Sequence, residues 1–268
     1  MGKKMRHAPV YFVIAQVRHN PVLKLGAYVP EIQDRMRKAG YPDHQSRPGL
    51  AVELNALRPD GQADPKPLVP KVVERHLFLS TDGTRGFIVE PGALSFQATE
   101  YDTFNPFLDE FMTTGLSIIH ESVKLDYTER LGIRYLDAVV PSGDGDDLTK
   151  YLSPGVLGLA GNLPKGTLIG LSLSETHIPL PEANLLSRTI IRSGPLGFPM
   201  DLEPQGLNVP ERFRSVSGLH AIIDTDASQN ERHVIDLSSV RERLDMLHNK
   251  IRMAFDATVT EHALQVWQ

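Results

Sequence analysis

The stretch ERLGIRYLDAV, residues Glu129–Val139, is the part of the sequence that decides how the chain is expected to fold. Side chains of an extended strand point alternately to its two sides. One side carries Leu131, Ile133, Tyr135 and Val139, and the other carries Gly132, Arg134, Leu136 and Ala138. Both sides are largely apolar, which is typical of a central strand that is covered on both faces. The stretch therefore predicts a sheet that extends to either side of this strand.

Arg134 places a charge at the centre of this strand. A buried guanidinium group is tolerated when a carboxylate pairs with it. One expectation is therefore a structural pair between Arg134 and an acid on another strand, such as Glu53 or Asp224. The other expectation is that Arg134 points into a groove between the two halves of the chain. In that case Arg18 and Tyr135 line the same groove, which would bind an anionic group.

The sequence before this strand predicts a first half that mixes strands and helices. Strands are expected at residues 10–17, 50–54, 76–80, 85–89 and 93–99, and helices at residues 28–39 and 105–123. Asp-Gly and Pro-Gly turns separate the last three strands, which indicates an antiparallel meander. Asn105 is the expected N-cap of the second helix, with Pro106 in its first turn. Residues 58–70 carry four prolines and are expected to form a loop or flap.

A tract rich in glycine and proline, residues 141–166, marks the expected junction between two domains. After it, strands are expected at residues 168–173, 188–192 and 219–224, with a Pro/Gly-rich excursion at residues 194–210. Ser239 and Glu242 form a capping-box pattern at the start of a long final helix that reaches Val259. The predicted class is α+β with two similar lobes, residues 1–145 and 146–268. Each lobe is expected to be a curved antiparallel sheet with one long helix packed on a face.

The composition is that of an ordinary soluble globular protein, with 41% hydrophobic and 23% charged residues among 268. The net charge of −5 disfavours nucleic acid as the main partner. The absence of cysteine excludes disulfides, thiolate nucleophiles and cysteine metal sites. Gln16 and Arg18 interrupt the apolar run near the N-terminus, which therefore predicts a first strand and not a signal peptide. Without a long apolar stretch, the expected location is the cytoplasm, away from membranes.

Sequence motifs for familiar chemistry are missing. The chain has no GxGxxG pattern after a strand, no P-loop, no HExxH and no GxSxG. We therefore expect no cofactor, and the catalytic residues of an enzyme cannot be named from the sequence. The interpretation favours a protein that is not an enzyme.

Asp224 and Asp226 are the candidates for a metal site. Alternate residues of a strand share one face, so these two carboxylates could hold Mg²⁺ or Mn²⁺ in a metal-dependent hydrolase. The competing interpretation is that they end a strand and begin a turn at DASQN, because aspartate favours turns. This second interpretation is preferred.

His248 lies beside Leu247 and Ile251 on the final helix. It is interpreted either as a histidine at the edge of the core or as a general base. A catalytic base needs a second group that orients it, and the sequence shows none nearby. The structural interpretation is therefore favoured.

Three segments together resemble a known family: APVYFVIAQVRHNPV near the N-terminus, RLGIRYLDAV at the centre and LHNKIRMAFDATVTEHALQVW at the end. The family is a group of sporadically distributed, uncharacterised bacterial and archaeal proteins of about this length. Its most specific element is Gly-Ile-Arg-Tyr, which Arg134 and Tyr135 match. The family pattern more often has asparagine at the position of Asp137, so the resemblance assigns that side chain no role. The patchy distribution of the family resembles that of phage-defence and toxin–antitoxin genes.

Two function hypotheses follow. The first is a non-enzymatic binding or regulatory component of a phage-defence or toxin–antitoxin type system, which recognises a partner protein encoded nearby. The second is an RNA-binding or nucleic-acid-processing protein with a central cleft lined by arginine and tyrosine. The candidate binding residues for either are Arg18, Arg134, Tyr135 and His248.

Overall fold

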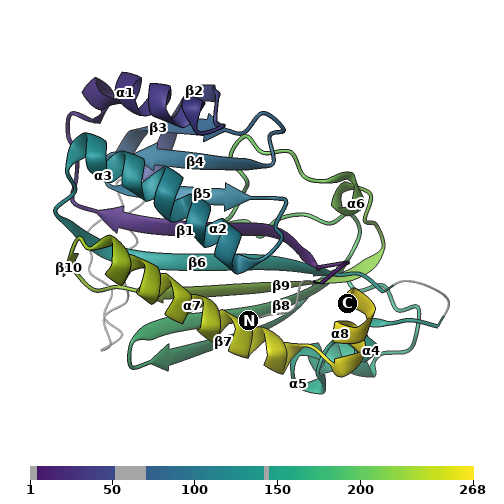
Figure 1. Cartoon of the computed structure of the whole chain (residues 1–268). Helices are drawn as coiled ribbons and strands as arrows, with labels where there is room; N and C mark the ends of the chain where they lie inside the picture. The colour runs from purple at the N-terminus through teal and green to yellow at the C-terminus, as the bar shows by residue number, and fades with distance from the viewer. Residues whose placement is uncertain (1–4, 52–70, 142–144) are drawn as a thin grey trace.

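A computed structural model describes residues 5–51, 71–141 and 145–268 of the chain. Its strands form one antiparallel sheet in the order β2-β3-β4-β5-β1-β6-β9-β8-β7, with the short β10 paired to β6 (Figure 1). The strands are β1 (Val10–His19), β2 (Asp43–Ala51), β3 (Lys71–Leu79), β4 (Arg85–Glu90), β5 (Ala93–Ala98), β6 (Tyr127–Val139), β7 (Ser172–Leu180), β8 (Ala183–Ser193), β9 (Leu219–Gln229) and β10 (His233–Val234). The stretch quoted at the start lies in β6, between β1 and β9, which confirms that it is a central strand.

The longer helices lie on one face of this sheet (Figure 1). They are α1 (Leu25–Lys38), the continuous run of α2 (Phe104–Glu110), the π-helical η1 (Phe111–Leu116) and α3 (Ser117–Val123), and α7 (Leu237–Thr258). Shorter helices are α4 (Leu148–Tyr151), α5 (Pro154–Leu157), the 3₁₀ turn η2 (Gly158–Asn162), α6 (Glu211–Arg214) and α8 (Glu261–Trp267). None of the helices in the described ranges is both long and apolar enough to cross a membrane.

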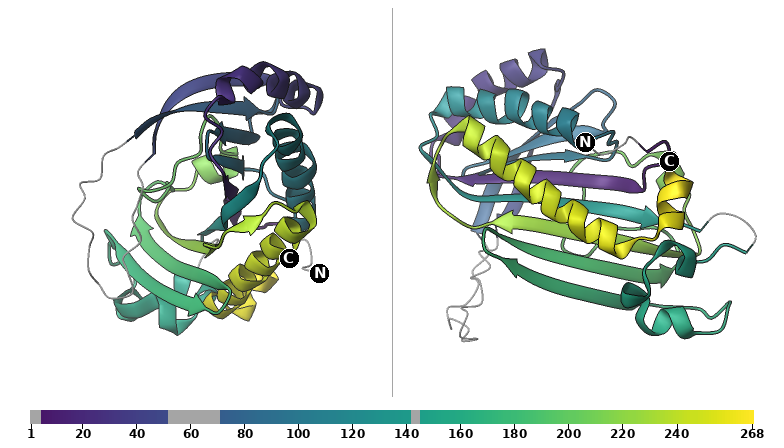
Figure 2. Two further views of the ribbon diagram at one scale, coloured as in Figure 1. Left: turned by 90° about the vertical axis from the view of Figure 1, so that its left-hand side faces the viewer. Right: turned by 60° about the horizontal axis from the view of Figure 1, so that its bottom comes forward.

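The sheet is strongly curved, and the helices lie on its outer side (Figure 2). We call the opposite side the hollow face. The segment between β8 and β9, which includes α6, lies in the hollow. Its residues Leu196, Phe198 and Phe213 pack there against Phe12 of β1 and Leu136 of β6. The central strands are thus covered on both faces, as their apolar sequence predicts.

The α+β class is confirmed, but the two halves of the chain share one sheet. β6 precedes the expected junction and β9 follows it, yet the two strands are paired from Leu131–Gln229 to Val139–Ala221. The main core also spans the junction, because Leu244 and Leu247 of α7 pack in the same cluster as Ile133. The tract at residues 141–166 therefore connects two halves of one sheet and does not separate two sheets.

Both long helical runs begin earlier than the sequence predicts. The N-cap of α2 is Thr103, so Asn105 lies within the first turn instead of capping it. The N-cap of α7 is Asp236, whose side chain accepts a hydrogen bond from the backbone N–H of Ser239 at 2.6 Å. An acidic cap suits the positive end of the helix dipole, which explains why the residue three positions earlier replaces the expected capping box.

Two strands in the second half differ from the prediction because pairing overrides turn preference. β9 continues through Asp226 to Gln229, since the residues up to Ser228 have partners on both β6 and β8 and Gln229 has a partner on β6. The turn expected at DASQN is therefore wrong. β7 lies at Ser172–Leu180 instead of residues 168–173, paired along its length with β8. The strand expected at residues 50–54 and the proline-rich flap lie mostly or wholly outside the described residues, and β2 ends at Ala51.

Candidate functional site

Arg134 and Tyr135 are neighbours in β6 and therefore point to opposite faces of the sheet. Arg134 lies on the hollow face, where it contacts acids from β9 and from the segment between β8 and β9. Tyr135 lies on the helix face, where its ring packs near Tyr101 and His248. The single groove lined by both residues, which the sequence suggested, is not formed. The structure instead shows two polar sites back to back.

On the hollow face, Arg134 is paired with two carboxylates. Its Nε and Nη2 donate to both oxygens of Asp224 at 2.7 and 2.8 Å, and its Nη1 and Nη2 donate to Asp201 at 2.9 and 3.1 Å. The side chain of Arg134 is 11% exposed and that of Asp224 is 2% exposed. Burial by itself lowers the pKa of Arg134, but the hydrogen bonds to Asp224 and Asp201 outweigh it and raise the pKa. Arg134 thus forms the structural ion pair with Asp224 that the sequence suggested.

The network around Arg134 extends outward through Arg188. The Nη1 of Arg188 donates to Asp224 at 3.2 Å, and its Nε donates to Glu175 of the edge strand β7 at 2.7 Å. Asp201 belongs to the segment between β8 and β9, so its pairing with Arg134 holds that segment against the sheet. The network therefore connects four strands, β6, β9, β8 and β7, and the segment that fills the hollow.

The metal interpretation of Asp224 and Asp226 is not supported by their surroundings. The two side chains share the hollow face, but the oxygens of Asp224 accept hydrogen bonds from two arginines. Burial raises the pKa of Asp226, whose closest cation is Arg130 at 4.0 Å. Among the described residues there is no group of three or more histidine, aspartate or glutamate side chains that could hold a metal ion. Arg18 lies opposite Arg130 across the β1–β6 pair and is exposed.

On the helix face, a cavity of about 860 Å³ lies between the first turn of α2, the middle of α7 and the end of β6. We call it the interhelical pocket. Its walls include Tyr101, Phe104, Tyr135, Asp137, His248 and Arg252. The volume falls within the range of roughly 300–1,000 Å³ that is usual for ligand sites. The chain segment before β1 and the last residue, Gln268, also line it.

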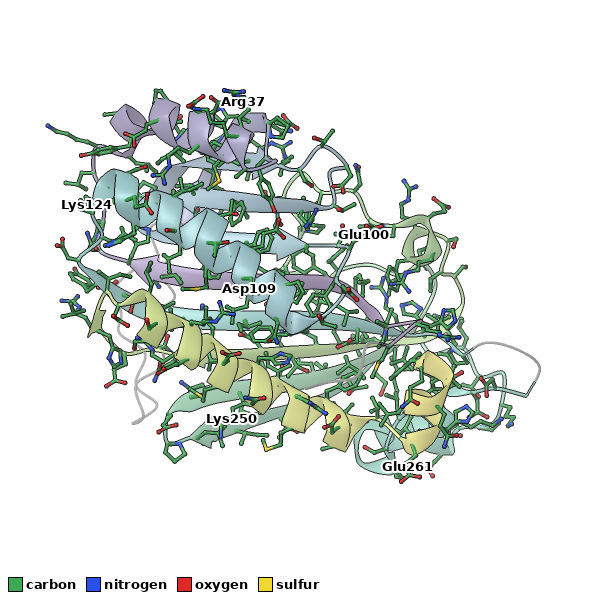
Figure 3. All side chains as sticks on the ribbon, in the orientation of Figure 1. Arg37, Glu100, Asp109, Lys124, Lys250 and Glu261 are labelled. Carbon is green, nitrogen blue, oxygen red and sulfur yellow. The ribbon has the colours of Figure 1, made fainter. Side chains whose placement is uncertain are left out.

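The pocket forms where the helices of the two halves meet. Phe104 at the start of α2 stacks on His248 of α7, with ring centroids 3.9 Å apart and planes 8° apart. Asp109, further along α2, forms an ion pair with Arg241 near the start of α7, and Figure 3 shows Asp109 on the side of α2 that faces α7. These two contacts hold the helices beside each other, and the stacked rings form part of the pocket wall.

Tyr101, Tyr135 and His248 form a chain of hydrogen bonds along the wall of the pocket. The hydroxyl of Tyr135 lies 3.1 Å from the hydroxyl of Tyr101 and 3.3 Å from Nδ1 of His248. Burial raises the pKa of both tyrosines, and it lowers the pKa of His248 to about 4 with a contribution from Arg252. All three groups are therefore neutral at pH 7. They offer hydrogen bonds but no strong base.

Asp137 is an acidic side chain that is buried in the wall of the pocket. It is 4% exposed and lies on the same face of β6 as Tyr135. No described residue forms a hydrogen bond or an ion pair with its carboxyl group. Burial raises the pKa of Asp137 to about 8. Period-two alternation in the quoted stretch could have found it, since an acid on an apolar face is the same signal that singled out Arg134.

The unusual state of His248 can be measured directly. Its imidazole is expected to remain neutral until the pH falls to about 4, because burial and the charge of Arg252 oppose protonation. Below the ordinary histidine pKa, the unfolded chain binds a proton that the folded chain does not, so this group lowers stability as the pH falls. Histidine ring signals followed by NMR between pH 8 and pH 4 test this. A midpoint for His248 near pH 6.5 would show that the ring is solvated.

The candidate binding residues therefore divide between the two sites. Tyr135 and His248 belong to the pocket, whereas Arg134 and Arg18 lie on the hollow face. Comparison with models of protein families, with curated proteins and with solved structures finds no match to this chain. The function must therefore be inferred from the geometry of the two sites.

Proposed function

We propose that this protein is a non-enzymatic binding module that recognises a partner protein, with the interhelical pocket as the place where part of the partner binds. The observation that carries this proposal is the pocket itself. It has the volume of a ligand site, aromatic walls, and a small number of polar groups that point into it. It also lies between a helix from the first half of the chain and a helix from the second, where binding sites commonly occur.

The chemistry of the pocket supports binding more than catalysis. Tyr101, Tyr135 and His248 are held in their neutral forms, so they act as hydrogen-bonding groups. Asp137 has a pKa near neutrality, but none of the described residues is hydrogen-bonded to its carboxyl group and orients it. General bases and nucleophiles are usually positioned by such a second group.

The second hypothesis, an RNA-binding cleft lined by Arg134 and Tyr135, has no support in the geometry. The two side chains lie on opposite faces of the sheet, and the donors of Arg134 are directed at Asp224 and Asp201. A phosphate would have to displace those carboxylates. Phosphate contacts normally come from arginines that are free to make them.

On the family resemblance alone, we propose that the partner is encoded beside this chain in a phage-defence or toxin–antitoxin type system. As part of the same proposal, we treat the two halves of the chain as two lobes. Each half contributes antiparallel strands and a long helical run at the pocket, and the partner would contact both halves where α2 and α7 meet.

The test is to express the chain together with the product of each flanking gene and to measure the affinity of any complex. Asn249→Trp places a large ring at the exposed rim of the pocket. We expect it to weaken the complex about tenfold or more, the effect of losing about 1.4 kcal/mol of binding free energy.

Lys250→Trp is the matched control. Lys250 is the next residue of α7 and is not part of the pocket lining (Figure 3). We expect this variant to bind within about twofold of the wild type, because tryptophan outside the pocket blocks nothing. Equal affinities of the wild type and Asn249→Trp for a partner would contradict the pocket as the recognition site.

A further inference from the structure

We propose that the group received by the interhelical pocket is a cation, either an ammonium or a guanidinium group, that pairs with the carboxylate of Asp137. This inference rests on the proposed function, because it takes the pocket to be a binding site. It adds the chemical class of the ligand. Four observations on the described residues carry it.

The first observation is that the carboxyl group of Asp137 is buried without a partner among the described residues. Its residue is 4% exposed, and the described part of the chain provides it with no hydrogen bond and no ion pair. Arg134, three positions away on the other face, shows the alternative, since it is paired with two carboxylates. Burying an unpaired carboxyl group costs free energy that a partner charge recovers. A cationic ligand would supply that partner.

The second observation is that the Asp137 carboxyl group borders the cavity. Asp137 and Tyr135 alternate with residues that face the hollow side, so both point to the helix face, and both line the pocket. A group that enters the pocket therefore reaches the carboxyl group from the open side.

The third observation is the aromatic character of the walls. Tyr101, Phe104 and Tyr135 line the same cavity as Asp137. The face of an aromatic ring carries negative potential and attracts ammonium and guanidinium groups. Aromatic walls beside a buried carboxylate are the combination expected for recognition of an organic cation, because they bind both the charge and the apolar part of the ligand.

The fourth observation is the balance of charge. Besides Asp137, the described residues that line the pocket include the aspartates Asp245 and Asp256 and one arginine, Arg252. The Nε of Arg252 lies 3.7 Å from Asp256 on the next turn of α7, so the arginine is itself paired. The pocket therefore presents an excess of negative charge, which attracts cations and repels carboxylates and phosphates.

The cation can come from a free small molecule or from a lysine or arginine side chain of a partner protein. The chemistry at Asp137 is the same for both. The two sources are separated by two pairs of probes with matched shapes. Benzylguanidine and benzylurea form the small-molecule pair. A capped Gly-Arg-Gly peptide and the same peptide with citrulline form the peptide pair. Within each pair, the second compound replaces a guanidinium group with a neutral urea.

Binding is measured by NMR of the full chain at pH 8.5, with shifts of residues that line the pocket as the readout. We expect at least one guanidinium compound to bind about tenfold or more tightly than its urea counterpart, the preference typical of a charge-assisted contact. The pair that shows the preference identifies the source as a free molecule or as a side chain of a polypeptide. Equal or tighter binding of the ureas would overturn the inference.

Asp137→Asn keeps the shape of the side chain and removes its charge, so the guanidinium preference should disappear. Glu242→Gln is the matched control. Glu242 lies on α7 and is exposed but does not line the pocket, and we expect this variant to keep the preference. An undiminished preference in Asp137→Asn would also overturn the inference. If Asp137→Asn did not fold, the pH dependence of ligand binding by the wild type would test the inference instead.

That pH dependence has a definite sign. The free carboxyl group has a pKa of about 8 and must lose its proton to pair with a cation. Binding of benzylguanidine, which stays charged throughout, should therefore strengthen about tenfold between pH 6.5 and pH 8.5. Constant or weakening affinity contradicts the inference. If only the neutral probes bound, the cation inference would fail but the proposed function would stand. If Asn249→Trp had no effect on a partner complex, the proposed function itself would fail.

Discussion

Arg134→Met is expected to reduce the free energy of unfolding by about 3–5 kcal/mol, the usual cost of removing one member of a buried ion pair. The variant leaves the carboxylate of Asp224, which is 2% exposed, without its two shortest hydrogen bonds. Arg188 remains at 3.2 Å as its only arginine contact among the described residues. Asp201 also loses Arg134, which holds the segment between β8 and β9 against the hollow face. Urea denaturation monitored by circular dichroism measures the loss.

Two further variants separate burial from charge in this network. Asp201→Asn is expected to lose no more than about 1 kcal/mol, because the side chain of Asp201 is 55% exposed and its pairing is screened by water. The double variant Arg134→Met/Asp224→Leu should recover most of the loss of the single variant, since it removes both buried charges. A loss for Arg134→Met as small as that for Asp201→Asn would show that Arg134 is solvated and free to bind a ligand.

Asp137→Asn is expected to stabilise the free protein, with an effect that grows with pH. The folded-state pKa of Asp137 is about 8, whereas its ordinary value is 3.8. Between these values the unfolded chain releases a proton that the folded chain retains, so the wild type loses stability as the pH rises. Asparagine has no such proton. The advantage of the variant should therefore increase by on the order of 4 kcal/mol between pH 5 and pH 8 and change little at higher pH.

Urea denaturation of the wild type and Asp137→Asn at pH 5, 6, 7 and 8 measures this slope. Asp245→Asn serves as the control, because it also replaces an aspartate of the pocket, but one whose side chain is partly exposed. Parallel stability curves for the wild type and Asp137→Asn would mean that the Asp137 carboxyl group is ionised and solvated in the folded protein. A gain in stability combined with a loss of ligand binding is typical of a functional site, where the free protein is less stable than it could be.

Much of the fold could be predicted from local patterns. The first strand, the helix after it, the meander of three strands and the two long helical runs all lie within a few residues of their predicted positions. These elements have strong hydrophobic periodicity, and Gly or Pro marks many of their ends. The errors occur where local preference and tertiary pairing disagree. Asp226 prefers turns in isolation, yet it lies in β9 because Arg134 and Leu186 pair with it from either side.

The candidate site was only partly predictable. Tyr135 and His248 were both singled out from the sequence, and the structure brings them to 3.3 Å across 113 positions of the chain. Tyr101 and Asp201 could not have been found, because each is a polar residue in an irregular segment that has no periodic signal. The partner of Tyr135 is set by how α2 and α7 cross the sheet, and local sequence contains no information on that crossing.

The sequence by itself determined that Glu129–Val139 is a central strand and that its two faces differ, because alternation along a strand depends on the backbone alone. It also determined that one charge lies at the centre of that strand. Only the tertiary structure decided whether each acidic or basic side chain of the strand has a partner. Arg134 meets two carboxylates from residues 67 and 90 positions away, whereas Asp137 on the other face meets an open pocket. The reason is physical: whether a buried charge is paired depends on groups that are brought together by packing, not by proximity in the chain.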